Sequence, residues 1–399
     1  MQRYPIEAHA NVRAIASSKI REVANAGLGK RDVLPFWFGE PDEVTPEFIR
    51  KAANEALANG ETFYTHNYGI PELREAIAAY ASRLHRPVPM EEIVVTNSGM
   101  AAIMLISQAL IGPGDRVVAV TPLWPNITSA PRLMGAEIVP VPLEFAKGSD
   151  GEWQWSLQVE RLLSALTPDT RALYLNAPSN PTGWTLEREG QRAVLERCRR
   201  LGIWIVADDA YERLYFEASS GCSPSFLDLA ERDERVLVTN TFSKSWLMTG
   251  WRLGWIVAPH ALVPEIAKLL EFNSSCVPGV SQQAGLAAII HGEPVVARTV
   301  ARFRRARDFL VARLREIDGV QAALPPGAMY AFFRIAGMTD SLAFCKRMAV
   351  EAGLGLAPGA AFGPEGEGFV RWCFAADEDR LADGVERLRR GLANFGRIE

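Results

Sequence analysis

The middle of the chain alternates short apolar runs with amphipathic stretches, and this alternation restricts the possible folds more than any other feature. The apolar runs that are typical of strands occupy residues 92–96, 115–120, 136–141, 171–175, 203–207, 236–239 and 255–258. Helical patterns, such as those at 101–111 and 187–201, lie between them. Strands that are apolar on both faces must be covered on both sides. We therefore expect an α/β fold, with a large domain built on a mainly parallel seven-stranded sheet covered by helices.

The last third of the chain has a different pattern, in which a long amphipathic helix precedes isolated strands and helices. These predicted elements occupy residues 296–317, 329–335, 342–352, 368–374 and 377–395. The N-terminal helical stretch precedes the main alternation and can join them. We expect a large cofactor-binding domain over residues 42–285 and a smaller α+β domain made from both chain ends, residues 1–41 and 286–399.

Composition and charge exclude several classes of protein. The chain has 399 residues, of which 48% are hydrophobic and 23% charged, as in an ordinary globular protein. Its net charge of −4 argues against a general nucleic-acid binder. The five cysteines form no Cys-x-x-Cys pair and the five histidines are scattered, so we expect neither a disulfide framework nor a metal site. Because neither a signal peptide nor a long apolar span is evident, we expect a cytoplasmic protein without membrane contact.

The segment that begins at Thr241 carries the clearest chemical signal. It reads Thr-Phe-Ser-Lys-Ser-Trp-Leu-Met-Thr-Gly-Trp-Arg-Leu-Gly and follows the apolar run at 236–239. A lysine at a strand end, here Lys244, can form a Schiff base with an aldehyde if its amine is partly desolvated. Thr241, Ser243 and Arg252 offer donors that suit a phosphate group. For a Ser-Lys pair alone, a surface loop with a solvated lysine is the commoner explanation.

Two carboxylates end the apolar run at 203–207. Asp208 and Asp209 stand at the carboxyl end of this strand, the edge at which parallel sheets bind ligands, and Tyr211 follows. A carboxylate beside a pyridine nitrogen keeps that nitrogen protonated, so that the ring can accept electrons. The alternative is an N-cap for the next helix, which suits Asp209 better than Asp208.

Turns after two other strands have side chains and amides suited to the same ligand. Residues 176–183 read Asn-Ala-Pro-Ser-Asn-Pro-Thr-Gly, which alone predicts only a rigid turn around Asn180. Ser98, Gly99 and Met100 lead from a strand into a helix, and the first amides of a helix form an anion site. A Ser-Gly turn by itself is more often a simple helix start.

Three further residues are unusual for their surroundings. Trp124, in Thr-Pro-Leu-Trp-Pro-Asn, offers a flat apolar face to a ring, unless it is buried in a core. Gly39, in Phe-Gly-Glu-Pro-Asp, permits close approach of a ligand. Arg371 stands in an apolar strand, where its charge is costly unless paired or unless an edge position lets its head reach solvent. Ten tryptophans, several of them near these segments, hint at an aromatic-lined pocket.

In this order and spacing, the segments resemble the class I/II aminotransferases, fold-type I enzymes that depend on pyridoxal 5'-phosphate. The resemblance covers nearly the whole chain. It implies that Lys244 forms the Schiff base with the cofactor and that Asp208 pairs with the pyridine nitrogen. Tyr211 and Asn180 would contact the phenolic oxygen of the ring, and Lys244, Asp208 and Tyr211 would be the catalytic residues. Asp209 replaces the Glu that is more usual in the family.

The resemblance also implies the other cofactor and substrate contacts. The cofactor phosphate would be held by Ser98, Gly99, Met100, Thr241, Ser243 and Arg252. The substrate carboxylate would meet Gly39, Asn180 and Arg371. Trp124 would stack on the cofactor ring. Tyr64, with Tyr68 as a nearby competitor, would reach the cofactor phosphate of the partner subunit, so a homodimer with shared active sites is expected.

The activity implied is the transfer of an amino group between an L-amino acid and a 2-oxo acid by a ping-pong mechanism. One aspartate-specific subgroup takes a second arginine from the partner's loop in the region of residues 272–280, and this segment has none. Another subgroup places a lysine where Met100 stands. We therefore expect neutral, aromatic or broad substrates, although Arg13 or His66 could supply a charge.

Three alternatives remain beside this interpretation. A carbon–sulfur β-lyase can use the same cofactor and the same residues. A non-enzymatic binding protein on a decayed version of the fold is disfavoured, because Lys244, Asp208 and Arg252 are all present. A nicotinamide dehydrogenase is disfavoured because no Gly-x-Gly-x-x-Gly opens a helix.

Overall fold

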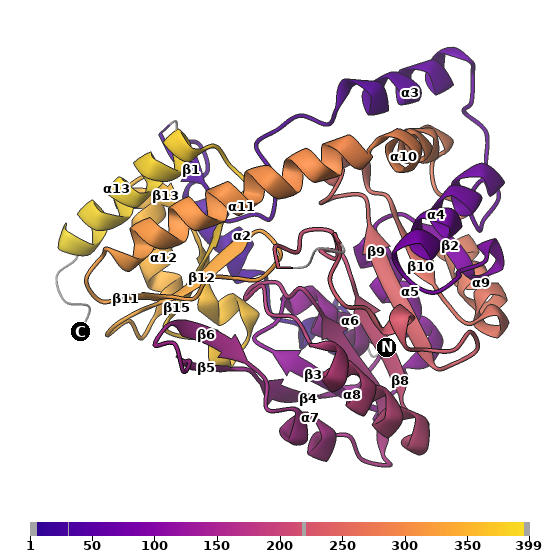
Figure 1. Cartoon of the computed structure of the whole chain (residues 1–399), viewed down its shortest axis with the longest axis horizontal. Coiled ribbons are helices and arrows are strands. Elements are labelled where there is room, and N and C mark those ends of the chain that lie inside the picture. The colour runs from indigo at the N-terminus through magenta and orange to yellow at the C-terminus, as the bar shows by residue number, and fades with distance from the viewer. Residues whose placement is uncertain (1–5, 31, 218–220, 395–399) are drawn as a thin grey trace.

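A seven-stranded sheet forms the centre of the computed structural model, which describes residues 6–30, 32–217 and 221–394 (Figure 1). The strand order is β2 (Ile93–Thr96), β10 (Gly254–Val257), β9 (Val236–Thr241), β8 (Trp204–Asp208), β7 (Thr170–Asn176), β3 (Arg116–Thr121) and β4 (Glu137–Pro142). Within this sheet β10 runs antiparallel to both of its neighbours, and the other paired strands are parallel. The predicted α/β fold with a mainly parallel seven-stranded sheet is confirmed.

Helices cover both faces of the central sheet. On one face lie α5 (Gly99–Leu110), α6 (Pro125–Leu133) and α9 (Val263–Ser274). On the other lie α4 (Pro71–Leu84), α7 (Val159–Ala165), α8 (Arg188–Leu201) and α10 (Gly279–His291), and α3 (Glu47–Ala58) packs on α10. Successive residues of β3 alternate between these layers, since Val117 packs with the first set and Val118 with the second. Burial on both faces explains why the strand sequences are almost continuously apolar.

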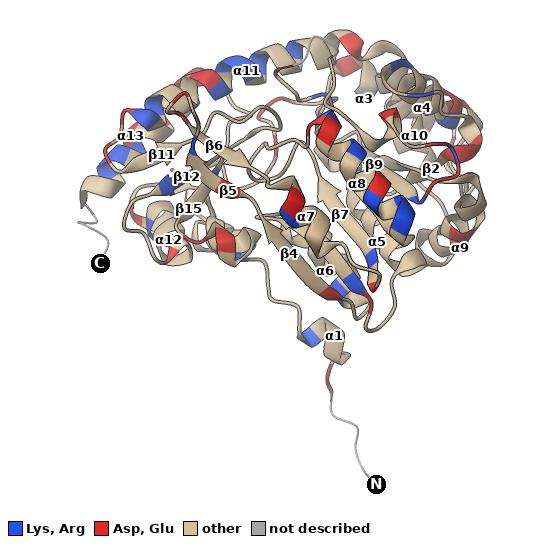
Figure 2. Ribbon diagram, turned by 60° about the horizontal axis from the view of Figure 1, so that its bottom comes forward, with Lys and Arg blue, Asp and Glu red and all other residues tan. Residues whose placement is uncertain are grey.

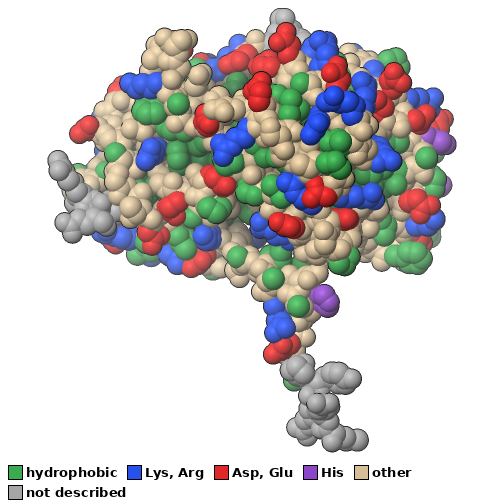
Figure 3. Space-filling model, turned by 90° about the horizontal axis from the view of Figure 1, so that it is seen from below, with side chains coloured by type: hydrophobic (Ala, Val, Ile, Leu, Met, Phe, Trp, Pro, Cys, Tyr) green, Lys and Arg blue, Asp and Glu red, His purple; other side chains and the backbone are tan. Residues whose placement is uncertain are grey.

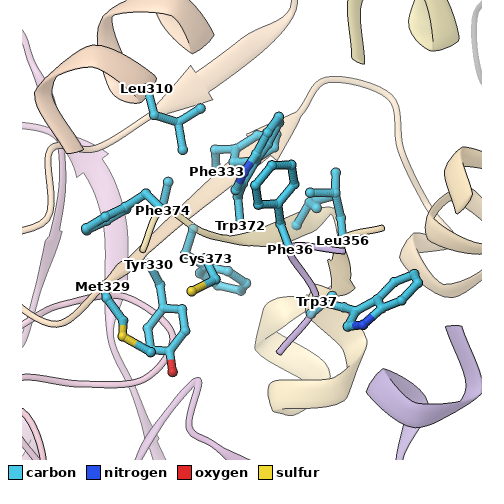
Figure 4. Close-up of a cluster of buried hydrophobic side chains, with 14 of the residues drawn as sticks. Phe36, Trp37, Leu310, Met329, Tyr330, Phe333, Leu356, Trp372, Cys373 and Phe374 are labelled. Carbon is cyan, nitrogen blue, oxygen red and sulfur yellow. The ribbon is translucent and has the colours of Figure 1, made fainter. Parts of the chain in front are cut away.

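The last third of the chain forms a second, antiparallel sheet. Its strand order is β11 (Val320–Ala322), β12 (Tyr330–Ile335), β15 (Phe369–Cys373) and β14 (Ala357–Pro358). The helices that pack against it are α11 (Glu293–Arg315), α12 (Ser341–Glu351) and α13 (Glu378–Asn394). Figure 4 shows Leu310, Phe333 and Trp372 within this core. The last residue of the helix predicted at 377–395 lies outside the described residues.

The N-terminal segment packs onto this second sheet. α2 (Lys19–Ala26) lies against α12 and β14, and β1 (Leu34–Pro35) pairs in parallel with β13 (Leu354–Gly355). Phe36 and Trp37 follow β1 and bury their rings in the same core (Figure 4). The short helix α1 (Ala10–Arg13) projects from the body of the molecule (Figure 2).

The hairpin of β5 (Glu144–Lys147) and β6 (Trp153–Ser156) lies outside the elements that the sequence predicts. Its aromatic side chains explain why it forms. Phe145 stacks on Trp153 with ring centres 4.9 Å apart, and Trp155 stacks on Phe332 of the second sheet at 5.6 Å. The hairpin therefore links the chain segment after β4 to the core of the second sheet.

The charged side chains on the face seen in Figure 3 are of both signs and are interspersed. In the described part of the chain, none of the helices combines the length and the hydropathy that a bilayer span requires. The same residues contain no group of His, Cys, Asp and Glu arranged to hold a metal ion.

Candidate active site

A cavity of about 390 Å³ lies where the carboxyl ends of the central strands face the second sheet. The predicted site residues that line it are Gly39, Gly99, Met100, Trp124, Asn180, Asp208, Tyr211, Thr241, Ser243, Lys244, Arg252 and Arg371. Two predicted residues, Ser98 and Tyr64, are not in its lining. This position at the carboxyl edge is where the fold class places ligands.

Lys244 follows the end of β9 and points into the cavity. Its Nζ donates a hydrogen bond to the backbone oxygen of Gly39 at 2.7 Å and lies 5.7 Å from the centre of the Tyr211 ring. Burial lowers the pKa of Lys244 from 10.5 to about 8, and the charges of Arg371 and Arg252 contribute in the same direction. An amine with this pKa is partly neutral near pH 7, as a nucleophile or general base must be.

Asp208 is buried at the end of β8 and faces the cavity. Its Oδ1 accepts a hydrogen bond from Thr239 Oγ1 and its Oδ2 accepts one from Asn176 Nδ2, both at 3.1 Å. Burial raises the pKa of Asp208 to about 6, and the hydrogen bond from Thr239 opposes this rise. A cationic ring nitrogen beside it would favour the ionised form. Asp209 does not cap a helix, because a turn follows it, and its Oδ2 accepts from Ser225 Oγ at 2.6 Å.

The first turn of α5 supplies backbone amides at one end of the cavity. Gly99 and Met100 begin this helix, whose N-terminus carries partial positive charge. Ser98 caps it, since Ser98 Oγ accepts from the amide of Ala101 at 3.1 Å, and the φ of Ser98 is 120°. Gly254 of β10 permits this packing, because a Cβ there would lie 2.6 Å from the Gly99 nitrogen. Ser98 thus shapes the amide site without lining the cavity.

Hydroxyl groups and a guanidinium complete the same end of the cavity. Thr241 Oγ1 and Ser243 Oγ are 2.9 Å apart. Arg252, with a left-handed φ of 53°, is exposed at the cavity margin and donates from Nη1 to the backbone oxygen of Thr249 at 2.8 Å. Helix amides, hydroxyls and the guanidinium of Arg252 form a donor set that suits a phosphate group.

The turn after β7 is held in place by Asn176. Its Oδ1 accepts from the amide of Asn180 at 2.7 Å, and its Nδ2 donates to the backbone oxygen of Asp208 at 2.9 Å. The amide of Trp124 donates to the backbone oxygen of Asn180, also at 2.9 Å. These bonds fix Asn180 and the partly buried Trp124 on the wall of one cavity.

Arg371 reaches the cavity from β15 and is 2% exposed. Its Nη1 donates to Asn180 Oδ1 at 2.9 Å, and its Nη2 donates to the backbone oxygen of Trp37. These acceptors are neutral, and Arg371 Nε has no hydrogen-bond partner among the described residues. β15 pairs on both sides, so the alternative of an edge strand with a solvated arginine is excluded. A buried guanidinium with neutral partners is suited to receive a carboxylate.

Tyr211 and Tyr330 meet from opposite sides of the cavity. Their hydroxyl oxygens are 2.7 Å apart, and both side chains are buried. Burial raises the pKa of both phenols, that of Tyr330 to about 12. A Cβ on residue 39 would collide with the Tyr330 hydroxyl, so this contact by itself requires glycine at position 39.

Tyr64 lies away from the cavity within a single chain. Its side chain is 89% exposed, and that of the adjacent Phe63 is 86% exposed. Tyr68 packs instead under the guanidinium of Arg74, 5.2 Å from the ring centre. The role of Tyr64 at a partner's cofactor stays a prediction.

The cavity also contains residues that sequence reasoning missed. They include Ser18, Ile20, Arg21, Phe38, Glu40, Ile103, Asn126 and Tyr330. Ile20 and Arg21 reach the cavity because α2 folds onto the second sheet, and no local pattern signals this long-range packing. Four aromatic residues, Phe38, Trp124, Tyr211 and Tyr330, line the cavity, as the number of aromatic residues near these segments suggested. Trp124 is the tryptophan among them, whereas Trp255 and Trp372 are buried in the cores.

The sequence of the chain was compared with those of known proteins and protein families. The family model described as "Aminotransferase class I and II" matches residues 31–388. The chain belongs to this family. An aspartate aminotransferase of Pyrococcus horikoshii is 31% identical, with 96% of each chain covered. A probable N-acetyl-LL-diaminopimelate aminotransferase of Bacillus subtilis is 32% identical, over 94% of this chain and 93% of that protein.

The fold of this aminotransferase agrees with that of solved family members. A single mutant of the Thermus thermophilus aspartate aminotransferase superposes with a TM-score of 0.88 at 31% identity, covering 97% of this chain and all of the other. The family depends on pyridoxal 5'-phosphate. The cavity fits that group in two respects: it is lined by donors that suit a phosphate, and the buried carboxyl of Asp208 is available to a pyridine nitrogen.

Proposed function

We propose that this aminotransferase moves an amino group between an L-amino acid and a 2-oxo acid by a ping-pong mechanism, with pyridoxal 5'-phosphate bound at Lys244. The observation that carries the proposal is that one cavity holds both a lysine of lowered pKa and a buried arginine, Arg371, with neutral partners. The lysine suits a bond to an aldehyde and proton transfer. The arginine suits the α-carboxylate that every amino acid and 2-oxo acid substrate carries.

Pyridoxal 5'-phosphate, when bound, supplies an aldehyde that takes up the amino group and a pyridine ring that accepts electrons. We assign Asp208 to the ring nitrogen, Tyr211 and Asn180 to the phenolic oxygen, and Trp124 to the ring face. We assign the phosphate to the site formed by Ser98, Gly99, Met100, Thr241, Ser243 and Arg252. These assignments rest on the donor and acceptor types at each end of the cavity.

In this proposal Lys244 moves the proton of the reaction. Its Nζ would take the proton from the substrate Cα as a general base and deliver it, as a general acid, to the carbon that carries the cofactor's aldehyde group. The hydrogen bond from Nζ to the backbone oxygen of Gly39 holds the amine in the cavity. Because burial already lowers its pKa, the amine loses its proton at lower cost than an exposed lysine would.

Arg371 orients the substrate for this step. Its guanidinium is fixed by Asn180 and by the backbone of Trp37, so little side-chain freedom is lost when a carboxylate binds. Gly39 and Asn180 line the same cavity, where we assign both to the substrate carboxylate. Closure of the second sheet over the substrate would exclude water from the cavity.

We propose neutral, aromatic or broad amino acid substrates. The cavity lining includes the apolar side chains of Ile20, Phe38, Met100 and Ile103, which suit apolar substrates. Arg21 is a cation in the same lining, with its guanidinium 5.7 Å from the centre of the Phe38 ring. It gives a broad-specificity site one position at which an acidic side chain could be bound.

A carbon–sulfur β-lyase remains the second candidate, because the residues that bind the cofactor and remove the Cα proton serve both reactions. The products separate the two. An aminotransferase needs an oxo-acid acceptor and releases no ammonia, whereas a lyase yields pyruvate and ammonia from a sulfur amino acid without an acceptor.

We further propose that the enzyme is a homodimer in which Tyr64 reaches the partner's cofactor phosphate. The support is the exposure of Tyr64 and Phe63, since two large aromatic side chains in water are typical of a surface that another chain covers.

We also propose that the chain divides into a large domain, residues 42–285, and a small domain formed by residues 1–41 and 286–399.

The test is a panel of amino acids with 2-oxoglutarate as acceptor, measured with the cofactor-loaded enzyme. We expect transfer, parallel lines in the double-reciprocal plots of a ping-pong reaction, and a higher kcat/KM for phenylalanine or methionine than for aspartate. Stronger turnover of aspartate would contradict the specificity. Pyruvate and ammonia formed without acceptor would favour the lyase.

A further inference from the structure

The hydroxyl pair of Tyr211 and Tyr330 links the cofactor end of the cavity to the substrate end. Tyr211 comes from the loop after β8, and Tyr330 begins β12 of the second sheet. Their oxygens are 2.7 Å apart, and their rings meet edge-on at 5.7 Å with an interplanar angle of 76°. The reaction as proposed above uses Tyr211 and gives Tyr330 no role.

The position of the Tyr330 hydroxyl is fixed from several sides. The guanidinium of Arg371 lies 4.4 Å from the centre of the Tyr330 ring. The missing Cβ of Gly39 provides the space that the hydroxyl occupies. In Figure 4 the ring of Tyr330 projects its oxygen away from Phe333 and Trp372, toward the side of the sheet that bears the cavity.

A count of protons restricts how this pair can act. Each phenol has one proton to donate and lone pairs to accept. One proton is used in the bond between the two oxygens, so only the phenol that accepts in this bond keeps its own proton for a third group. If Tyr330 donates, Tyr211 is left as a donor toward the cavity.

Electrostatics favours Tyr330 as the donor. A cation over the ring face stabilises negative charge on a phenol, and Arg371 is close to the ring of Tyr330. Arg371 opposes the rise that burial causes in the pKa of Tyr330, and this opposition is the second largest influence on that phenol. Burial and the neighbouring Tyr330 raise the pKa of Tyr211, and the opposing effect of Arg371 on this pKa is smaller than either. The more acidic phenol donates in a bond between two phenols.

We propose that Tyr330 is a positioning residue for the cofactor: it donates its proton to Tyr211 and thereby directs the Tyr211 proton to the phenolic oxygen of the cofactor ring. This inference rests on the proposed function. A donor at the phenolic oxygen stabilises negative charge there, so less charge remains to hold the proton on the nearby nitrogen that joins Lys244 to the cofactor. Loss of the Tyr330 hydroxyl should therefore raise the pH at which that nitrogen deprotonates.

The test is the pH titration of the visible absorbance of the cofactor-loaded protein, compared with that of Tyr330→Phe. We expect the midpoint of the colour change to move to higher pH by roughly 0.3–1 unit and the cofactor to bind about two- to ten-fold more weakly, as for the loss of one hydrogen bond. Tyr174→Phe is the matched control, because Tyr174 is buried and its hydroxyl bonds Ser107 at 2.9 Å away from the cavity. This control should leave both measurements unchanged.

A double substitution separates a positioning role from a direct one. In a Tyr211→Phe background, Tyr330→Phe should cause no further shift of the midpoint, because its effect passes through the Tyr211 hydroxyl. An equal shift in both backgrounds, or no shift in a coloured Tyr330→Phe protein, would overturn this inference alone. A parent protein that takes up no cofactor would overturn the proposed function and this inference together.

Discussion

Arg371 Nη1 donates a hydrogen bond to Asn180 Oδ1 at 2.9 Å, and this bond determines how Asn180 faces the cavity. Because the amide oxygen is occupied by the guanidinium, the amide nitrogen is the part of the side chain left to donate to a ligand. The two residues are 191 positions apart in the chain: Arg371 lies on β15 of the second sheet, and Asn180 lies in the turn after β7 of the central sheet. The bond therefore couples the proposed substrate clamp to the proposed cofactor contact.

Arg371→Lys should weaken substrate binding while keeping the charge. A lysine cannot bond Asn180, the backbone of Trp37 and a carboxylate with one planar group. We expect kcat/KM for amino acids to fall about 100-fold or more, mainly through KM, in line with the loss of a buried charge-assisted contact. Steady-state kinetics with a fixed oxo acid measures this.

The control for this substitution is Arg334→Lys, since Arg334 lies on β12 of the same sheet but is exposed. It should keep the parent kinetics. Similar losses for both variants would show that the effect of Arg371→Lys is not specific to the cavity.

Asp208→Asn should uncouple cofactor binding from catalysis. An amide cannot hold a proton on the pyridine nitrogen, so the ring becomes a poorer electron acceptor. The phosphate donors of the cavity are unchanged. We expect cofactor to bind while kcat falls about 100- to 1000-fold, the usual effect of losing one electrostatic stabiliser. Full activity in Asp208→Asn would remove this carboxylate from the mechanism.

Much of the site could be predicted because it lies at strand ends. Lys244, Asp208, Asn180 and Gly99 each follow an apolar strand closely in sequence, and parallel strands bring their carboxyl ends to one edge. The resemblance to the aminotransferases then predicted that these residues share one ligand, and they line one cavity. Local sequence and topology were sufficient for this half of the cavity.

The other half could not be predicted because it depends on contacts between distant segments. Tyr330 appears in the sequence as one more apolar strand residue, and its role follows only from the approach of Gly39 and Tyr211. Arg21 reaches the cavity because α2 packs on the second sheet. The hairpin of β5 and β6 likewise depends on long-range packing, because Phe145 and Trp155 pack against the second sheet.

Gly39→Ala should damage the cavity through Tyr330. The new Cβ would collide with the Tyr330 hydroxyl, and the backbone oxygen that accepts from Lys244 would shift with it. Because a displacement of about 1 Å near the reacting atoms can cost about 100-fold in rate, we expect kcat/KM to fall by that order. Gly112→Ala is the control, since a Cβ there would meet only an ordinary contact at 3.8 Å. Unchanged kinetics in Gly39→Ala would contradict the close approach of the Tyr330 hydroxyl to Gly39.

His85 should make stability depend on pH. Its ring nitrogens lie 2.8 Å from Asp228 Oδ1 and 3.3 Å from Glu212 Oε2, with 1% of the side chain exposed. Burial alone would lower the pKa of His85, but the hydrogen bonds with the two carboxylates outweigh it and raise the pKa to about 10. Folding therefore favours the protonated ring.

The stability that this proton provides is complete below the unfolded pKa near 6.5 and is lost as the pH rises toward 10. His85→Gln should lower the free energy of unfolding by about 3 kcal/mol at pH 6, as for a broken buried ion pair, and by clearly less at pH 10. Urea unfolding at both values measures this, with the exposed His291→Gln as control. An equal loss at pH 6 and pH 10 would rule out a role for the charge.

The central claim is that Lys244 binds pyridoxal 5'-phosphate through its Nζ. The most direct measurement is to load the protein with the cofactor, reduce it with borohydride, digest it and locate the modified peptide by mass spectrometry. We expect one phosphopyridoxyl group per chain on Lys244, and loss of the visible absorbance in Lys244→Ala. Modification of exposed lysines such as Lys51 with Lys244 left unmodified, or no uptake of cofactor, would contradict it.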